Sequence, residues 1–547
     1  MIGVIANPAD QEVIREFFEL FKTPWEMYRS DRKYDVLLCS SDAHFDATAK
    51  LVLVYAGRKT HFDDEQKISI GRQRRHACIL SYRGCRFPLY GESIAFAQSG
   101  AGLLTDEESR ECGAYCYNSA GTVFGRIGYD LFDEVRTLLT AGQPPSNAIL
   151  PTLELHIALL RDLIIEAGIP LVEVPPVPYG FQFIACLTHD VDHPMICAHR
   201  WDHTMLGFLY RAVLGSLWRT IRGRMPVRDL LRNWAAAIKL PLVYFGLTRD
   251  FWREFDDLYL ELERGIPSTF FVIPFKDCPG EGPNGQAPAY RAAAYRAKDI
   301  ADIIRKLLAK GREVALHGID AWADSSRGFQ ELEEIRRLTG RSDIGVRMHW
   351  LYLDEHSPAA LERAGAAYDS TIGYNENVGY RAGTTQVFKS MKANQLLELP
   401  LHVMDTALFY PTYLDLSPAE AMKLIRQIAD NAVRFGGCIT INWHDRSVAP
   451  ERLWGQCYRD LIGELRARGA WFATAREAVA WFRKRRSVVF EVDPRGPVVT
   501  KVRFPEVGIP GLRFRQVETR PVNGLATHHP EDYIDKPIHE CSDIPVA

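Results

Sequence analysis

Two aspartates and two histidines crowd into one short segment, His189-Asp190-Val191-Asp192-His193. Carboxylates this close repel each other unless a cation lies between them or they hold their protons differently. Imidazole and carboxylate groups are also the ligands that zinc and related divalent metals prefer. The segment therefore indicates either a bound cation or two carboxylates with distinct roles.

Histidine or aspartate also follows other apolar runs of the chain. The runs and their polar residues are 183–188 with Asp190 and Asp192, 314–316 with His317, 346–348 with His349, and 439–443 with His444. In a (β/α) barrel the working side chains project from the carboxyl ends of the strands, where the loops form one mouth. We expect these residues to meet at that rim.

The elements that would position these residues lie in residues 179–485, where strand-like runs alternate with helical patterns. Further strands are predicted at 268–273 and 396–403, and helices at 299–308 and 418–435. Repeated βα units over a segment of this length predict an α/β fold with a distorted (β/α) barrel.

The motifs come in a specific order: Thr188-His-Asp-Val-Asp192, Gly265-Ile-Pro-Ser-Thr-Phe-Phe-Val272, Glu313-Val-Ala-Leu-His-Gly318, Tyr380-Arg-Ala-Gly-Thr384 and Trp443-His444. This set resembles the NodB homology domain of the polysaccharide deacetylases (carbohydrate esterase family 4) over residues 181–450. The resemblance implies a distorted barrel of NodB type and one divalent metal ion, zinc above all. It also implies a hydrolase that cleaves a non-peptide carbon–nitrogen bond to remove N-acetyl groups from amino sugars.

The resemblance assigns a role to each matching position. Asp190 is similar to the catalytic base of the family, and Asp192 to its metal-binding aspartate. His317 matches the first histidine of the metal motif. Arg381 resembles the arginine that holds the base in place, and His444 the late histidine that acts as general acid.

The sequence departs from the family pattern at Ala321, where the metal motif has its second histidine. His349 is the preferred replacement, because it ends the strand next to the one that carries His317. Asp320 is the alternative ligand, and loss of the metal is a third outcome. Either nitrogen or carboxylate oxygen suits zinc or its first-row neighbours.

Three further side chains are candidates near this rim. Asp405 could orient His444 or Arg381, with an ordinary capping role as the alternative. Tyr380 and Trp443 could line a sugar site, although aromatic side chains near strand ends more often pack in the core.

The flanking regions carry no catalytic pattern. Residues 1–125 predict a smaller α/β domain of unknown role, and 126–178 a helical connector that ends in a proline-rich strip. Residues 486–547 predict a small β appendage followed by a flexible tail.

A basic helical insert is predicted at 195–247, where a short βα loop would suffice. Eight arginine and lysine residues face only two aspartates between residues 195 and 247, and apolar residues alternate with them. An amphipathic helix of this kind fits a membrane surface or a lipid-linked or phosphorylated sugar. The alternative is a helical lid whose arginines lie in water.

Bulk composition narrows the class of protein. The 547 residues carry a net charge of -3, which gives no indication of nucleic-acid binding. The start of the chain has no leader pattern, no window has the apolar length of a membrane span, and eleven cysteines are scattered without a repeating spacing. We therefore expect a cytoplasmic protein, peripheral at the inner membrane face if the insert binds lipid.

The function expected from the sequence is removal of an N-acetyl or related acyl group from an amino sugar. The substrate would be a precursor of a surface polysaccharide or glycoconjugate, lipid-linked or nucleotide-linked. One alternative is an inactive barrel that binds sugar or acts as a scaffold. Another is a hydrolase of a non-sugar amide.

Overall fold

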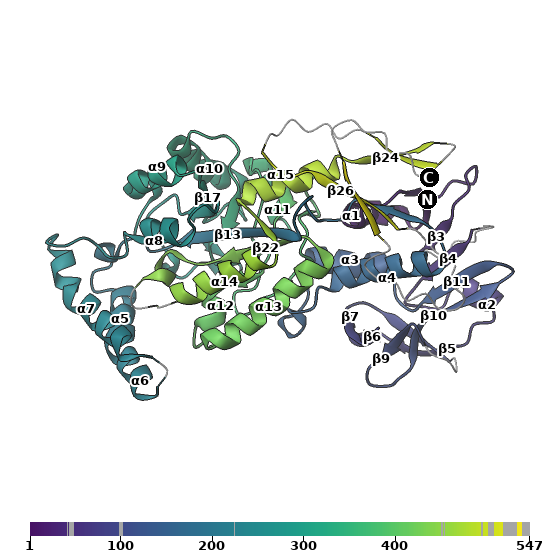
Figure 1. The fold of residues 1–547 in the computed structure, drawn as a ribbon, viewed down its shortest axis with the longest axis horizontal. Helices are drawn as coiled ribbons and strands as arrows, with labels where there is room; N and C mark the ends of the chain where they lie inside the picture. The colour runs from purple at the N-terminus through teal and green to yellow at the C-terminus, as the bar shows by residue number, and fades with distance from the viewer. Residues whose placement is uncertain are drawn as a thin grey trace.

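The protein is described by a computed structural model that covers residues 1–547 apart from 41, 43–48, 98–101, 224, 450–451, 453, 494–495, 501–507, 518–532 and 539–547. It is a mixed α/β protein. Figure 1 shows an N-terminal sheet at one end, a second sheet with its helices in the middle, and helices α5 to α7 at the other end.

The central sheet is parallel and has the order β18-β17-β14-β13-β22-β21, with β23 also paired to β13. Its long strand β13 is buried over all nine residues, as a strand covered on both faces must be. The strands are β13 (Phe183–Val191), β14 (Thr269–Val272), β17 (Glu313–Gly318), β18 (Val346–Met348), β21 (Val403–Met404), β22 (Cys438–Asn442) and β23 (Ala470–Ala473).

Beyond β18 the sheet curls through isolated bridges instead of full strands. Asp369 pairs in parallel with both Val346 and Glu398. The strand predicted at 396–403 is broken into β20 (Leu397–Glu398), which pairs antiparallel with β19 (Phe388–Lys389), and β21, which pairs with β22. The sheet is therefore a curled parallel sheet of the kind expected for a distorted barrel.

Helices pack around the curled sheet, and three of them begin at residues whose side chains cap the helix. α13 (Pro418–Phe435) has the bounds predicted from sequence and begins at a capping box between Ser417 and Glu420. The helix predicted at 299–308 is α9 (Ala301–Ala309). The others are α8 (Phe255–Leu262), α10 (Ser325–Thr339), α11 (Ser357–Ala364), α12 (Asp405–Phe409), α14 (Gly455–Ala467) and α15 (Ala475–Arg486).

The N-terminal sheet has eleven strands and is mixed in direction. Parallel strands lie at one side: β1 (Ile2–Ile5), β2 (Trp25–Met27), β3 (Val36–Cys39), β4 (Leu51–Tyr55) and β11 (Thr122–Ile127). The antiparallel part contains β5 (Ile70–Arg74), β6 (Cys78–Tyr82), β7 (Cys85–Leu89), β8 (Ser93–Phe96), β9 (Leu104–Asp106) and β10 (Cys112–Ser119).

Two helices of the predicted connector pack on this N-terminal sheet. α3 (Leu131–Thr140) and α4 (Thr152–Glu166) share a hydrophobic core with α1 (Gln11–Phe21) and the parallel strands. The same core includes Ala382 and Phe388 from the central region. Residues 126–178 therefore belong to the packing of the N-terminal sheet and join it to the central one.

The C-terminal region forms two small sheets. β24 (Val489–Asp493) pairs with β25 (Gly496–Thr500), and β26 (Leu512–Val517) lies between β12 (Leu171–Glu173) and β27 (Tyr533–Ile538). The predicted tail contains β27, and the rest of it, 518–532 and 539–547, lies outside the described residues.

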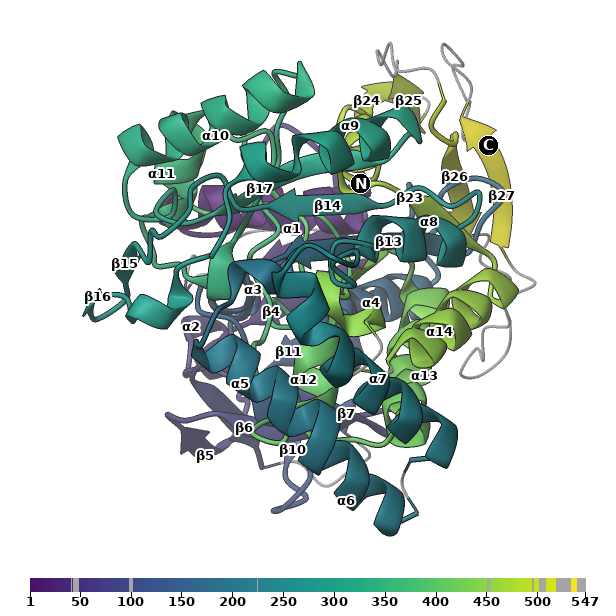
Figure 2. The same cartoon turned by 90° about the vertical axis from the view of Figure 1, so that its left-hand side faces the viewer.

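The basic insert folds as successive helices after β13. They are α5 (His203–Leu209), a π-helix (Tyr210–Gly215), α6 (Ser216–Ile221) and α7 (Val227–Tyr244). Figure 2, which views the molecule from this end, shows them in the foreground, below the central strands β13, β14 and β17. No helix in the described ranges is long and apolar enough to cross a membrane.

Candidate functional site

A cavity of about 520 Å³ lies where the parallel strands of the central sheet end. It contains the polar residues at or just after the carboxyl ends of β13, β17, β18 and β22, as expected for parallel strands. These residues are Asp190, Asp192, His317, His349 and His444, and the cavity is also lined by Tyr290, Trp350, Tyr410, Arg446 and His203.

Asp190 is fixed in the floor of this cavity. Asn442 of β22 donates to its Oδ2 over 2.7 Å, and Arg347 of β18 donates to its Oδ1 over 3.0 Å. Burial by itself raises the pKa of this carboxyl, but the neighbouring His317 and Arg347 outweigh burial and hold the pKa below its ordinary value. Asp190 is therefore a held, ionised carboxylate.

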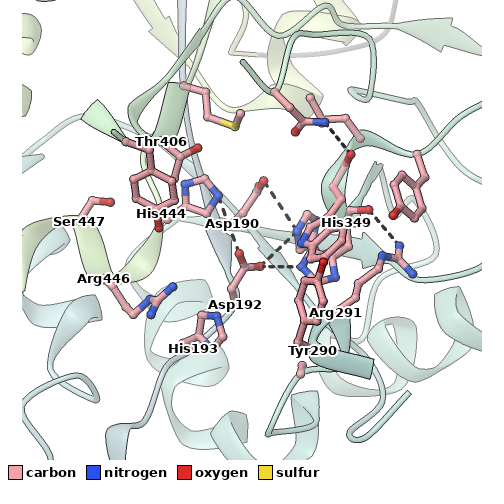
Figure 3. A pocket seen from close by; sticks show the side chains of 18 of the residues that line it. Asp190, Asp192, His193, Tyr290, Arg291, His349, Thr406, His444, Arg446 and Ser447 are labelled. Carbon is pink, nitrogen blue, oxygen red and sulfur yellow. Dashed lines mark hydrogen bonds and ion pairs between the residues drawn. The ribbon is translucent and has the colours of Figure 1, made fainter. Parts of the chain in front are cut away.

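Asp192, His317 and His349 bring three ligand atoms within 4.8 Å of one another. Asp192 Oδ1 lies 3.3 Å from His317 Nε2 and 3.7 Å from His349 Nε2. A metal bound at about 2 Å from each ligand needs ligand atoms about 3–4 Å apart. The three side chains form a candidate metal site, and Figure 3 shows His349 and Asp192 beside Asp190 in the pocket.

A buried oxygen of Asp192 suits a cation at this position. Asp192 Oδ1 is buried and has no hydrogen-bond partner among the described residues. His317 Nδ1 lies 2.9 Å from the carbonyl of Arg347, which only accepts, so this nitrogen donates and Nε2 is the ring atom that faces Asp192 Oδ1. A carboxylate oxygen and an imidazole nitrogen that face each other in this way can share a divalent metal ion, so the residues present fit one.

Close packing of two strands places both histidines at one rim. β17 and β18 pair in parallel, with His317 opposite Arg347 and Gly318 opposite Met348. A Cβ at Gly318 would lie 2.6 Å from Met348 Sδ, so glycine leaves the space that the Met348 side chain occupies.

The chain directly after His349 has a strained backbone. Trp350 and Leu351 have φ of 63° and 54°, a left-handed conformation that costs non-glycine residues of order 1–3 kcal/mol each. The buried Arg291 donates to the carbonyl of His349 over 2.9 Å and holds this turn. The strain is located beside the candidate ligand.

His444 lies on the other side of the pocket, 3.8 Å from Asp192 Oδ2. Its Nδ1 is 2.6 Å from Asp405 Oδ1, and its backbone N–H donates to Asp405 Oδ2. Ser447 also donates to Asp405. Burial disfavours a charged imidazole, but Asp405 outweighs burial and raises the pKa of His444 to about 10. Asp405 thus orients His444, one of the two roles considered for it.

The structure corrects two expectations about charged residues. Arg381 donates to the carbonyl of Gly373 over 3.0 Å, and the arginine that contacts Asp190 is Arg347. Asp320 accepts hydrogen bonds from Glu281 N and Arg327 instead of joining the candidate metal site. The reason is that the turn after β17 points Asp320 toward the loop that contains Glu281.

The expected sugar-binding role of Tyr380 and Trp443 is also corrected. Both side chains are 0% exposed and belong to the main hydrophobic core. Tyr380 donates to the carbonyl of Ile428. Trp443 directly precedes His444, and its ring packs against Phe409 and Tyr458, away from the cavity.

Five residues at the site were not predicted from the sequence: Arg347, Asn442, Tyr290, Trp350 and Arg446. Two of these had a usable signal, because Arg347 and Asn442 are polar residues inside buried strands, two residues before His349 and His444. Alternation along a strand places residues two apart on the same face. Tyr290 lies in a long loop with no periodicity to predict its direction.

No family model matches the chain, and no curated protein sequence matches it. Among solved structures, the chain is similar to a protein described as a polysaccharide deacetylase from Mycobacterium smegmatis, at 21% identity over 57% of this chain and 95% of that one, with a TM-score of 0.35. A second such protein, from Pseudomonas aeruginosa, gives 13% identity over 59% and 98% of the two chains and a TM-score of 0.36. A 4-alpha-glucanotransferase from Thermococcus litoralis gives 12% identity over 55% and 40%, with a TM-score of 0.31. TM-scores this low carry no argument about function, so the function must be inferred from the side chains of the site.

Proposed function

We propose that this protein is a metal-dependent hydrolase that removes an N-acetyl or related acyl group from an amino sugar. The observation that supports this most is the meeting of a carboxylate–imidazole metal site with a held carboxylate, Asp190, and a charged histidine, His444, in one cavity. A protein that only binds sugar needs neither a base nor an acid.

Asp192, His317 and His349 would hold the metal, with zinc suited to this donor set. When bound, such an ion polarises a carbonyl oxygen and lowers the pKa of water.

The chain's own residues supply the proton transfers. Asp190, ionised and held by Arg347 and Asn442, accepts the proton of the attacking water. His444, kept charged by Asp405, donates a proton to the leaving amine. Asp405 is buried and accepts four hydrogen bonds, so it holds the imidazole in one orientation.

The cavity walls suit a sugar. Tyr290 and Trp350 have ring centroids 5.5 Å apart on one side, and aromatic faces pack against the apolar faces of sugar rings. Arg446 lies on the side of His193 (Figure 3) and can donate to hydroxyl or acidic groups.

Acyl release tests this proposal. Zinc-loaded wild-type protein and the Asp190→Asn and His444→Gln variants would be incubated with N-acetylated amino sugars, and acetate would be measured. We expect release by wild type and a loss of at least about 100-fold in each variant, since general acid–base groups contribute about 10²–10⁴-fold. No release from any sugar by metal-loaded wild type would contradict the proposal and favour a sugar-binding role.

A further inference from the structure

The helical insert exposes an unusual amount of apolar surface. Of the twenty large hydrophobic residues that are exposed within the described parts of the chain, fourteen lie between 201 and 247. Monomeric proteins rarely leave contiguous apolar patches in water without a binding role. A lid whose arginines simply lie in water would not need these side chains.

The exposed apolar residues form a stripe on α7. Its members, with their exposed fractions, are Val227 61%, Leu231 58%, Trp234 36%, Ile238 74%, Leu242 41% and Phe245 80%. Spacings of three and four residues place them on one helical face. A different face of α7, with Ala236, Leu240 and Val243, is buried in the core of the insert. The exposed stripe is thus additional to the face that folding requires.

A second stripe follows the preceding helices. Leu206, Tyr210, Leu214, Leu217 and Ile221 are 37–75% exposed at the same kind of spacing. Here too another face, with Met205, Phe208 and Ala212, is buried in the insert's core. The insert therefore has one apolar surface that packs on the protein and another that faces outward.

Charge decides which partner fits the outward surface. Exposed cations flank the stripes, namely Arg200, Arg222, Arg228, Arg232 and Lys239. The acids of this segment are engaged locally: Asp202 caps α5 and bonds His199, and Asp229 lies within 4.0 Å of Arg228 and Arg232. Two copies of such a surface would repel each other, whereas an anionic surface attracts it.

Aromatic residues at the edge of the stripes fit a lipid interface. Trp201 is 86% exposed and Trp218 52%, and the guanidinium of Arg222 lies 3.5 Å above the ring of Trp218. Tryptophan and tyrosine prefer the headgroup level of a bilayer, and long basic side chains extend from an apolar surface to the charged layer. A basic amphipathic helix with these residues lies in the plane of the interface.

The outward surface is close to the catalytic pocket. His203, the first residue of α5, lines the cavity, and Leu206, one turn later, is 55% exposed. One helix, about 10 Å across, therefore separates the apolar stripe from the cavity.

We propose that α5 to α7 dock the protein on the surface of an anionic lipid bilayer and that the pocket takes a lipid-anchored amino sugar from that surface. The docking part stands on the exposed stripes and their charges. The substrate part rests on the proposed function.

Vesicle co-sedimentation tests the docking. The full-length protein would be mixed with phosphatidylcholine vesicles, with and without phosphatidylglycerol. We compare wild type with Leu231→Glu/Ile238→Glu/Phe245→Glu on the α7 stripe. The matched control, Tyr179→Glu/Phe329→Glu/Val433→Glu, places the same charges at exposed hydrophobic residues outside the insert. Circular dichroism verifies the fold of each form.

We expect wild type and the control to bind anionic vesicles, and the stripe variant to bind at least about 10-fold more weakly. Arg222→Gln/Arg228→Gln/Arg232→Gln should weaken binding about 100-fold, because each cation near an anionic surface contributes about fivefold. Wild type that ignores vesicles, or a stripe variant that binds as well as wild type, would overturn the docking. So would a wild-type dimer that the stripe variant converts to monomer, since the stripe would then be an interface between copies.

Hydrolysis of a soluble N-acetylated sugar separates this inference from the proposed function. We expect all four forms to release acetate equally from it, while only the vesicle-binding forms act faster on a lipid-linked sugar in vesicles. Equal rates on the lipid-linked sugar in all forms would overturn the substrate part. Vesicle binding without any acetate release would overturn the proposed function and leave the docking intact.

Discussion

Arg347 should set the acidity of Asp190, and its replacement should change the pH dependence of the reaction. Its Nη1 donates to Asp190 Oδ1 over 3.0 Å and to Thr188 over 2.7 Å, while Nε and Nη2 bond Ser370. The guanidinium is fully buried. An opposite charge this close lowers a carboxyl pKa by about 1–3 units, or about 1.4–4 kcal/mol.

Arg347→Met should therefore raise the pKa of Asp190. Because the base works only when ionised, the acid limb of kcat/KM should move to higher pH by about 1–3 units. The lowered pKa also stabilises the wild-type fold above the unfolded carboxyl pKa, and this stability is lost as the pH falls. At neutral pH the free energy of unfolding of the variant should therefore be lower than that of wild type by about 3–5 kcal/mol, the cost of breaking a buried ion pair.

The assay is acetate release as a function of pH, with urea unfolding of the same proteins. Arg347→Lys keeps the charge and should restore part of the shift if Arg347→Met folds poorly. Arg381→Met is the matched control, because the Arg381 side chain donates to the carbonyl of Gly373, whereas Arg347 donates to Asp190. An unchanged acid limb in both Arg347 variants, or an equal shift in Arg381→Met, would refute the reasoning.

Three other changes have defined outcomes. Asp405→Asn should lower the pKa of His444 from about 10, so the alkaline limb of kcat/KM should move to lower pH by about 1–3 units; a limb that stays in place would show that Asp405 does not charge His444. Ala321→His should not restore metal binding to His349→Ala, because Ala321 is fully buried and an added ring would overpack the core and lower the stability by about 1–3 kcal/mol. Equilibrium dialysis with zinc measures the binding and thermal unfolding measures the stability. Recovered zinc binding would contradict the geometry. Trp443→Phe should lower the free energy of unfolding by about 1–3 kcal/mol with KM unchanged, because the ring lies in the core; a raised KM at equal stability would return Trp443 to the sugar site.

The buried strands and the choice of His349 could be predicted from the sequence. The run at 183–188 is apolar at every position before Thr188, which is typical of a strand covered on both faces, and it forms the first part of β13. His349 was expected beside His317 because neighbouring parallel strands end at one rim, and the pairing of β17 with β18 places them there. The positions of the apolar runs in the sequence were enough for both predictions.

Side-chain direction outside regular strands could not be predicted. Arg381 lies in a segment with little regular structure, where no periodicity indicates which way a side chain points. Trp443 was misjudged because Asn442 contacts Asp190 and His444 lines the cavity, so alternation turns the residue between them into the core. The apolar outer face of the insert was ambiguous from sequence, since the same pattern fits a packed lid.

The central claim is that Asp192, His317 and His349 together hold one divalent metal ion. Anomalous diffraction from zinc-loaded crystals tests it most directly, with metal stoichiometry measured on His317→Ala and His349→Ala. We predict a single strong peak about 2 Å from both Nε2 atoms and an Asp192 oxygen, and loss of stoichiometric zinc in both variants. A peak that lacks any of these three ligands, or full zinc occupancy in either variant, would contradict the account.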